Sequence, residues 1–187
     1  MAALCMCACG SISRKTSAKI PRHVTIMRIL TTDNPEDLTA LRNKAKKLTK
    51  KDAASEWFAA LKPSMLATVT DPSNTGVGIA APQVGIGYRL IAVQRFDKED
   101  NPFEFYINPE ITAYSEERVT GDEGCLSVPS VYEPVSRSAI IDIRYRDQKT
   151  WKWVEETVSG FTAVIFQHEA DHLDGILFTD RIASSNE

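Results

Sequence analysis

Residues 161–175, FTAVIFQHEADHLDG, form the stretch of the chain that is most informative about its fold. Apolar side chains at Phe161, Val164 and Ile165 recur at the spacing of one helix face. Gly175 follows this pattern, and glycine is common just after the last turn of a helix. The stretch therefore predicts a buried helix that runs from Phe161 to the residue before this glycine.

The same stretch carries two histidines and a glutamate in the order H-E-x-x-H. His168 and His172 share a helix face because they are four residues apart, so two neutral imidazoles can bind one metal ion. Glu169 is turned about 100° from His168 and can reach a metal-bound water instead of acting as a ligand. The pentapeptide also occurs in proteins without a metal, but unpaired polar groups are costly in apolar surroundings such as these. A metal site is therefore the favoured interpretation.

Two protein ligands are too few for a catalytic metal site, which usually has three and a water molecule. No histidine follows His172, and His23, the only other one, lies in a segment that we leave out of the fold. Three downstream carboxylates are too close to the helix end or to the chain terminus. They belong to Asp174, Asp180 and Glu187.

Cys125 is the remaining candidate for the third ligand. It lies in the segment GDEGCLSVPS, residues 121–130, where glycines before it favour a turn. A thiolate is a strong ligand for divalent zinc or iron. A single cysteine is more often a small buried apolar residue. Here the missing third ligand favours metal binding.

The composition fits one globular domain. The chain has 187 residues, of which 43% are apolar and 25% charged. A net charge of −3 excludes a strongly basic protein and gives no support to binding of nucleic acid or an anionic membrane. The chain has no run of about 18 apolar residues, so no transmembrane helix is predicted.

The N-terminal segment, residues 1–25, is left out of the predicted fold. It contains three of the four cysteines, so the cysteines do not form a disulfide framework for the domain. They are Cys5, Cys7 and Cys9. A short apolar run and a small residue before Cys9 resemble a bacterial lipoprotein signal, although the basic region of an export signal is missing. The alternatives are an unstructured extension and a start codon chosen upstream of Met27.

Two helices are expected before the strands begin. The first starts in the segment TDNPE, residues 32–36, which has a capping side chain and an early proline. Its apolar positions recur at helical spacing. They are Leu38, Leu41, Ala45 and Leu48. The second helix is predicted over about 53–66, where Pro63 kinks or divides it.

The middle of the chain predicts strands, because β-branched and aromatic residues are frequent and polar and apolar residues alternate. The predicted strands cover residues 88–93, 103–107, 111–119, 139–145 and 151–158. Residues 147–150, DQKT, predict a hairpin turn between the last two. Strands bracketed by helices, with a hairpin among them, indicate an α+β fold.

Three segments together resemble the signature motifs of the peptide deformylase family. They are GVGIAAPQ (residues 76–83), EGCLS (residues 123–127) and QHEADH (residues 167–172), and their order along the chain also agrees. The resemblance covers roughly residues 27–182 and implies a single catalytic domain over residues 26–187. It implies antiparallel β-sheets packed around a central helix that carries H-E-x-x-H.

The resemblance also implies the activity and the roles of the site residues. The family removes the formyl group from the N-terminal formyl-methionine of new polypeptides and releases formate. Cys125, His168 and His172 would hold one divalent ion, with ferrous iron in the cell and zinc or nickel as substitutes. Glu169 would transfer the proton, and the Gln83 side chain and the Leu126 backbone N–H would stabilise the oxyanion.

The predicted substrate-binding residues surround this centre. Gly76 and Gly78 would let the substrate backbone approach closely, and Gly78 with Ile79 would pair with it like an added strand. Gly124 is predicted to contact the substrate. Four apolar residues are candidates for the methionine pocket, although core packing explains any one of them equally well. They are Ile79, Leu126, Val164 and Ile165.

The supporting residues, the partners and the location are also expectations at this stage. Asp171 is expected to orient a ligand by a hydrogen bond, and Glu123 and Arg137 are expected to form an ion pair. The substrates would be nascent formyl-methionyl chains, with the ribosome as a transient partner. The cytoplasm is favoured, and export or lipid anchoring is the alternative. A general zinc endopeptidase and a non-catalytic ribosome- or peptide-binding module are the competing interpretations.

Overall fold

The structure, a computed structural model, describes residues 23–182. Its helices are α1 (Pro35–Leu41), α2 (Lys50–Ala53), α3 (Glu56–Val69) and α4 (Gly160–Leu173), with short 3-10 helices η1 (Ala81–Val84) and η2 (Phe178–Arg181). Its strands are β1 (Gly78–Ala80), β2 (Leu90–Gln94), β3 (Phe103–Tyr114), β4 (Arg118–Cys125), β5 (Val128–Ser138), β6 (Ile140–Arg146) and β7 (Trp153–Ser159). The predicted N-terminal extension lies outside the described residues, apart from its last three.

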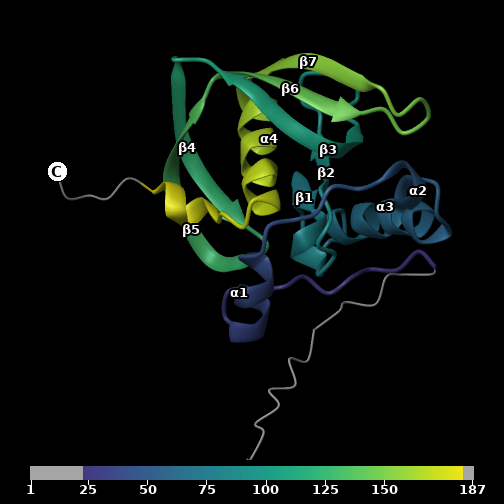
Figure 1. The fold of residues 1–187 in the computed structure, drawn as a ribbon. Coiled ribbons are helices and arrows are strands. Elements are labelled where there is room, and N and C mark those ends of the chain that lie inside the picture. The colour runs from purple at the N-terminus through teal and green to yellow at the C-terminus, as the bar shows by residue number, and fades with distance from the viewer. Residues whose placement is uncertain (1–22, 183–187) are drawn as a thin grey trace, which may run out of the picture.

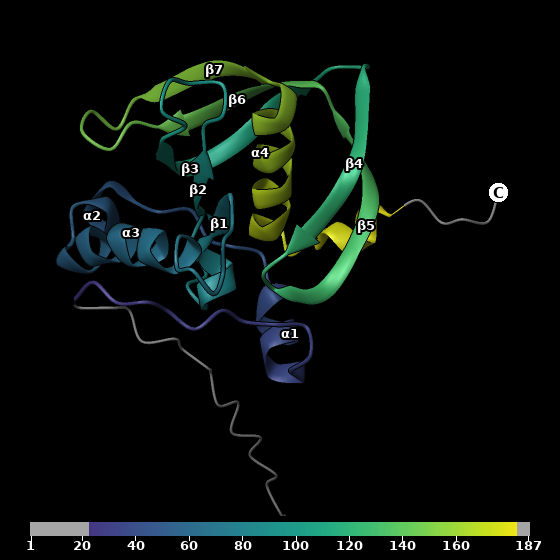
Figure 2. The ribbon, with the colours of Figure 1, turned by 180° about the vertical axis from the view of Figure 1, so that it is seen from behind.

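Two antiparallel sheets flank helix α4. Five strands form one sheet in the order β1-β2-β3-β6-β7, and β4 and β5 form a separate hairpin. Helix α4 lies between the five-stranded sheet and the hairpin, while α3 packs near β1 (Figure 1). The view from behind shows the same arrangement (Figure 2). The predicted α+β fold, with antiparallel sheets around a central helix, is confirmed.

Helix α4 contacts both sheets. Its apolar side chains face the five-stranded sheet, and its polar side chains face the hairpin. Phe166 packs with Ile91 and Tyr106 in the core of the five-stranded sheet. His168 faces the hairpin, where its ring contacts Glu123. The predicted helix and its end are confirmed, since Gly175 follows with φ +73°, a conformation that favours glycine.

The first predicted helix is too long. Helix α1 ends at Leu41, although Ala45 and Leu48 are buried as expected. These two residues lie in an extended segment in which the Ala45 N–H donates to the Leu173 carbonyl oxygen and Lys46 forms an isolated β-bridge with Tyr88. Ala45 and Leu48 are therefore buried by contacts with distant parts of the chain, although their spacing resembles that of a helix.

The second predicted helix is confirmed with shifted ends. Helix α3 begins after Ser55, whose hydroxyl accepts a hydrogen bond from the Phe58 N–H, and it continues to Val69. Pro63 lies inside the helix and does not divide it. The short helix α2 precedes it, with Thr49 as its N-cap.

The predicted strands at 88–93, 139–145 and 151–158 match β2, β6 and β7 within two residues at each end. The turn at residues 147–150 is confirmed by the Trp151 N–H, which donates to the Asp147 carbonyl oxygen. The predictions at 103–107 and 111–119 were wrong in their limits. Strand β3 runs through both segments to Tyr114, with an irregularity at Asn108, and a turn separates it from β4.

Strand β5 was not predicted. Its sequence, VPSVYEPVSRS, contains two prolines and many polar residues, which a single sequence associates with loops. In the structure it pairs along its length with β4. Across residues 23–182, no helix is long and apolar enough to cross a membrane.

Candidate metal centre and substrate cleft

One thiol and two imidazoles converge between helix α4 and the end of strand β4. The ligand atoms of Cys125, His168 and His172 all lie within 4.8 Å of one another. The Cys125 Sγ is 3.2 Å from His172 Nε2. Helix α4 supplies the histidines from successive turns of one face, and the hairpin supplies the cysteine at a register irregularity after Gly124. The structure thus brings the predicted third ligand to the histidine pair.

Glu123 fixes the orientation of one histidine. Its carboxylate lies 2.8 Å from His168 Nδ1, and it accepts two hydrogen bonds from Arg137, at 2.8 and 2.9 Å. A hydrogen bond to Nδ1 leaves the other ring nitrogen of His168 available for a metal. The predicted Glu123–Arg137 ion pair is present, but its contact with the histidine was missed. Alternation along β4 places Glu123 on the same face as Cys125, and this was the available signal.

Asp171 does not have the contact expected of it. Its carboxylate accepts hydrogen bonds from Arg137 at 2.5 Å and from Arg181 at 2.7 Å. It therefore acts on the site through Arg137, which in turn holds Glu123. This chain of ion pairs connects His168 to the C-terminal helix η2.

The electrostatics of the cluster fit a bound cation. Burial lowers the pKa of His168, but hydrogen bonds to Cys125 and Glu123 outweigh this effect and raise the pKa to about 10. Burial lowers the pKa of His172 well below its usual value, so this imidazole stays neutral. The groups around His168 thus favour a positive charge beside Cys125 and the neutral His172. This charge is the proton of His168 or, in its place, a bound metal ion. A soft sulfur and two imidazole nitrogens are a donor set suited to zinc or iron.

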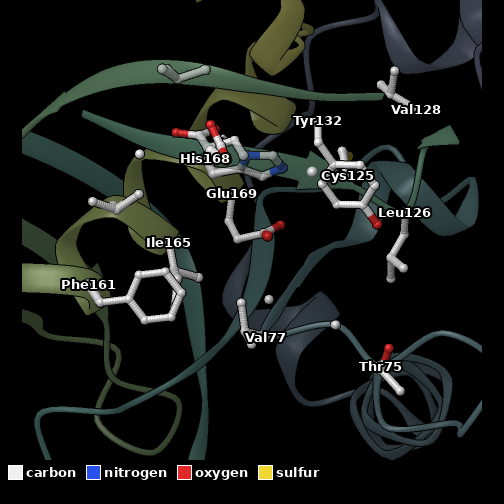
Figure 3. A pocket seen from close by; sticks show the side chains of 18 of the residues that line it. Thr75, Val77, Cys125, Leu126, Val128, Tyr132, Phe161, Ile165, His168 and Glu169 are labelled. Atoms are coloured by element: carbon white, nitrogen blue, oxygen red, sulfur yellow. Dashed lines mark hydrogen bonds and ion pairs between the residues drawn. The ribbon is translucent and has the colours of Figure 1, made fainter. Parts of the chain in front are cut away.

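Glu169 lies beside the cluster and faces the cleft (Figure 3). Its side chain is buried, and its Oε2 has no hydrogen-bond partner within residues 23–182. Burial raises the pKa of Glu169 to about 7. A carboxylate with a pKa near neutrality can both accept and return a proton at physiological pH.

Gln83 is held with its amide nitrogen toward the cluster. Its Oε1 accepts a hydrogen bond from the Ala80 N–H at 2.8 Å, and its Nε2 donates to the Ser127 hydroxyl at 3.3 Å and to Cys125 Sγ at 3.5 Å. The Ser127 N–H also donates to Cys125 Sγ, at 3.4 Å. Gln83 and Leu126, the two residues predicted to supply the oxyanion donors, both line the cleft described next.

A cleft of about 840 Å³ leads to this cluster. It contains most of the predicted substrate-binding residues, which are Gly76, Gly78, Gly124, Leu126, Val164 and Ile165. Ile79 is the exception. Its side chain is fully buried in the core that includes Leu61 and Leu90, and in the described part of the chain it does not line the cleft. Alternation along β1 turns Ile79 inward while Gly78 faces Glu169.

We expect Gly78→Ala to lower kcat/KM by about 10- to 100-fold without unfolding the protein, because a catalytic group displaced by about 1 Å can cost that much. A Cβ at this position would lie 2.5 Å from Glu169 Oε1 and 2.9 Å from its Cδ. Steady-state kinetics and thermal denaturation would measure the two effects. Gly87→Ala is the matched control, because nothing lies within 4 Å of its Cβ position. Equal kinetics for the two variants would contradict the close contact.

A Cys/His/His cluster with a buried glutamate at the bottom of a cleft defines a metal-dependent hydrolase. Comparison with known proteins identifies the family. The family model for polypeptide deformylase matches residues 26–187. A peptide deformylase of Caulobacter vibrioides is 40% identical over 161 residues, which are 86% of this chain and 90% of that protein. The chain therefore belongs to the polypeptide deformylase family, and it is a hydrolase that removes the formyl group from the N-terminus of peptides.

Two further comparisons agree. A peptide deformylase of Synechocystis sp. is 42% identical over 143 residues, covering 76% of this chain and 73% of that protein. The structure of a class I type b peptide deformylase from Acinetobacter baumannii bound to Met-Ala-Ser superposes with a TM-score of 0.73. It is 36% identical in sequence, with 84% of this chain and 99% of that chain covered.

Proposed function

We propose that this chain hydrolyses the formyl amide of nascent formyl-methionyl peptides at the centre formed by Cys125, His168 and His172. The observation that carries this proposal is the convergence of these three ligand atoms within 4.8 Å, directly beside Glu169. A peptide-binding module without activity would need neither the buried glutamate nor the thiol. The presence of both groups therefore favours catalysis over binding alone.

The three ligands would hold one divalent ion. When bound, such an ion supplies Lewis acidity, because it lowers the pKa of a water and polarises a carbonyl oxygen. Glu169 accepts the proton of the attacking water and later delivers it to the departing amine nitrogen. Its unpaired Oε2 and its position in the cleft support this role.

The oxyanion needs donors that are in place before the reaction. The Gln83 Nε2 and the Leu126 backbone N–H supply them. The hydrogen bond between the Ala80 N–H and Gln83 Oε1 determines which end of the amide faces the reaction centre. Because Gln83 is buried, its side chain loses little additional freedom when the oxyanion forms.

The substrate backbone binds along the cleft as an extended strand. Strand β1 is at the edge of its sheet and pairs there with β2, so its other edge faces the cleft. Gly76 and Gly78 carry no side chains that would keep a peptide away from this edge. The methionine side chain packs against Val164 and Ile165, which line the cleft from helix α4. Ile79 contributes through its backbone, since its side chain is in the core.

The physiological ion is ferrous iron, and zinc or nickel can replace it. His168 would give up its proton on metal binding, and one thiolate with two neutral imidazoles would then leave a bound divalent ion with a formal charge of +1. The partners are nascent chains and, transiently, the ribosome.

The site of action is the cytoplasm, where new chains emerge. Mass spectrometry of the N-terminus of the purified protein tests this location. Removal of the residues before Cys9 would indicate export instead.

Formate release tests the function directly. Protein loaded with ferrous iron without oxygen should release formate from formyl-Met-Ala-Ser and leave Met-Ala-Ser. Acetyl-Met-Ala-Ser and free Met-Ala-Ser should remain intact, and a chelator should abolish the reaction. Cleavage of an internal peptide bond, or no formate from metal-loaded protein, would contradict the proposal and favour an endopeptidase or a binding module.

A further inference from the structure

The segment before α1 crosses between two parts of the reaction centre, and the mechanism above gives it no role. Residues 24–32, here called the crossing segment, run from α3 to α1 and are the purple stretch in Figure 1. The Leu30 N–H donates to the Gln83 carbonyl oxygen at 2.7 Å, and the Thr32 N–H donates to the Ser127 carbonyl oxygen at 2.8 Å. The crossing segment is thus bonded both to the residue that carries the oxyanion amide and to the segment that carries the thiol.

The two residues that accept these bonds also meet in the reaction centre. The Gln83 Nε2 donates to the Ser127 hydroxyl and to Cys125 Sγ, and the Ser127 N–H donates to the same sulfur. Both Gln83 and Ser127 are buried. A shift of one backbone past the other would change the distance between the Gln83 amide nitrogen and the sulfur. The crossing segment opposes such a shift, because it is bonded to both backbones.

Asp37 of α1 fixes the register of the crossing segment. The N–H groups of an extended chain point alternately to opposite edges, so Leu30 and Thr32 donate on one edge and Thr31 on the other. The Thr31 N–H donates to Asp37 Oδ2 at 3.2 Å. Arg28, also in the crossing segment, donates to both carboxylate oxygens, at 2.6 and 2.8 Å. Asp37 is buried, so water is a poor substitute for these partners.

We propose that Asp37 is a positioning residue for the reaction: through the crossing segment, it holds the Gln83 amide at the distance from Cys125 that the oxyanion requires. This inference rests on the proposed function, in which Gln83 donates to the oxyanion. Asp37 is not among the described residues that line the cleft, so it acts through Gln83 and not by contact with the substrate. Its loss should therefore appear in kcat and not in KM, because the oxyanion forms only during the reaction.

Kinetics with formyl-Met-Ala-Ser tests the proposal. Asp37→Ala should lower kcat by about 5- to 50-fold, because displacement of a catalytic group by about 1 Å can cost about 100-fold. KM and metal content should stay within about twofold of the wild type. Asp37→Asn keeps an oxygen for the Thr31 N–H, and Arg28→Ala removes only the ion pair, from a side chain that is 68% exposed. Each of these two variants should lose just about 2- to 3-fold in kcat.

A double-mutant cycle with Gln83 separates positioning from a general loss of stability. Gln83→Leu keeps the volume of the side chain but has no amide, and loss of one oxyanion donor costs about 100-fold or more. In this background Asp37→Ala should lower the residual kcat by less than about twofold, since the group that it positions is gone. Equal fold losses with and without the Gln83 amide would overturn the proposal. If Asp37→Ala does not fold, Arg28→Ala takes its place in the same cycle, and its smaller loss should also disappear.

Asp52→Ala is the control for stability. The Asp52 carboxylate accepts hydrogen bonds from the Thr49 N–H and hydroxyl at the start of α2, and in residues 23–182 it bonds to no part of the crossing segment. This variant should melt at a lower temperature and keep its kcat. A fall in its kcat as large as that of Asp37→Ala would overturn the proposal, as would an unchanged kcat in Asp37→Ala. Absence of formate with the wild type would instead refute the proposed function, and this role of Asp37 with it.

Discussion

Replacing Glu169 by alanine is expected to lower kcat by about 100-fold or more while the protein keeps its metal. The side chain is 3% exposed and faces the cleft, but it is not one of the three converging ligands. In the proposed mechanism, its loss removes the group that takes the proton of the attacking water. Initial rates of formate release and metal analysis by mass spectrometry measure the two quantities on the same preparation.

Two further variants make this result specific. Glu169→Gln keeps the volume of the side chain but cannot accept the proton, so its kcat should fall by a similar factor. Glu155→Ala removes an exposed glutamate of β7, which is not part of the cleft, and should behave like the wild type. Turnover of Glu169→Ala at the wild-type rate would remove this residue from the mechanism. Loss of metal together with activity would make it a supporting residue of the metal centre.

Replacing Cys125 by alanine should weaken metal binding by at least about 100-fold, because loss of a residue that merely orients a ligand already costs 10- to 100-fold. Activity should fall with the metal. The physical reason is that two imidazoles remain, and a site with two protein ligands is too weak to hold the ion in a fixed geometry. Competition with a metal-sensitive chelator measures the affinity independently of turnover.

Cys9→Ala serves as the control for thiol loss, since Cys9 lies outside the described residues and far from Cys125 in the sequence. It should keep both metal and activity. Unchanged metal affinity in Cys125→Ala would refute the ligand assignment. The proposed chemistry would then need a different third ligand.

The sequence alone was sufficient for features that depend on neighbouring residues. Helix α4, its end at Gly175 and the two histidines on one face all follow from spacings of a few residues. The turn at residues 147–150 is local in the same sense. Such features are predictable because short-range backbone geometry has few alternatives.

Patterns failed where burial came from distant parts of the chain. Ala45 and Leu48 lie at helical spacing, but neither N–H bonds within a helix. The Ala45 N–H donates to the Leu173 carbonyl oxygen, and the Leu48 N–H donates to the Asn108 side-chain oxygen. Strand β5 was missed because its prolines and polar residues are typical of loops. Both are tolerated in this strand, because β4 is its one partner in a two-stranded sheet. Ile79 was assigned to the pocket, and only the orientation of β1 shows that its side chain faces the core.

The sequence by itself determined the chemistry available to this protein: a histidine pair, a glutamate beside it and a single cysteine outside the N-terminal segment. Only the tertiary structure decided how these groups meet. Cys125 is 47 residues from His172, and Glu123 is 45 residues from His168, yet both pairs are in contact. No local spacing encodes such contacts, because they arise from packing the hairpin against α4.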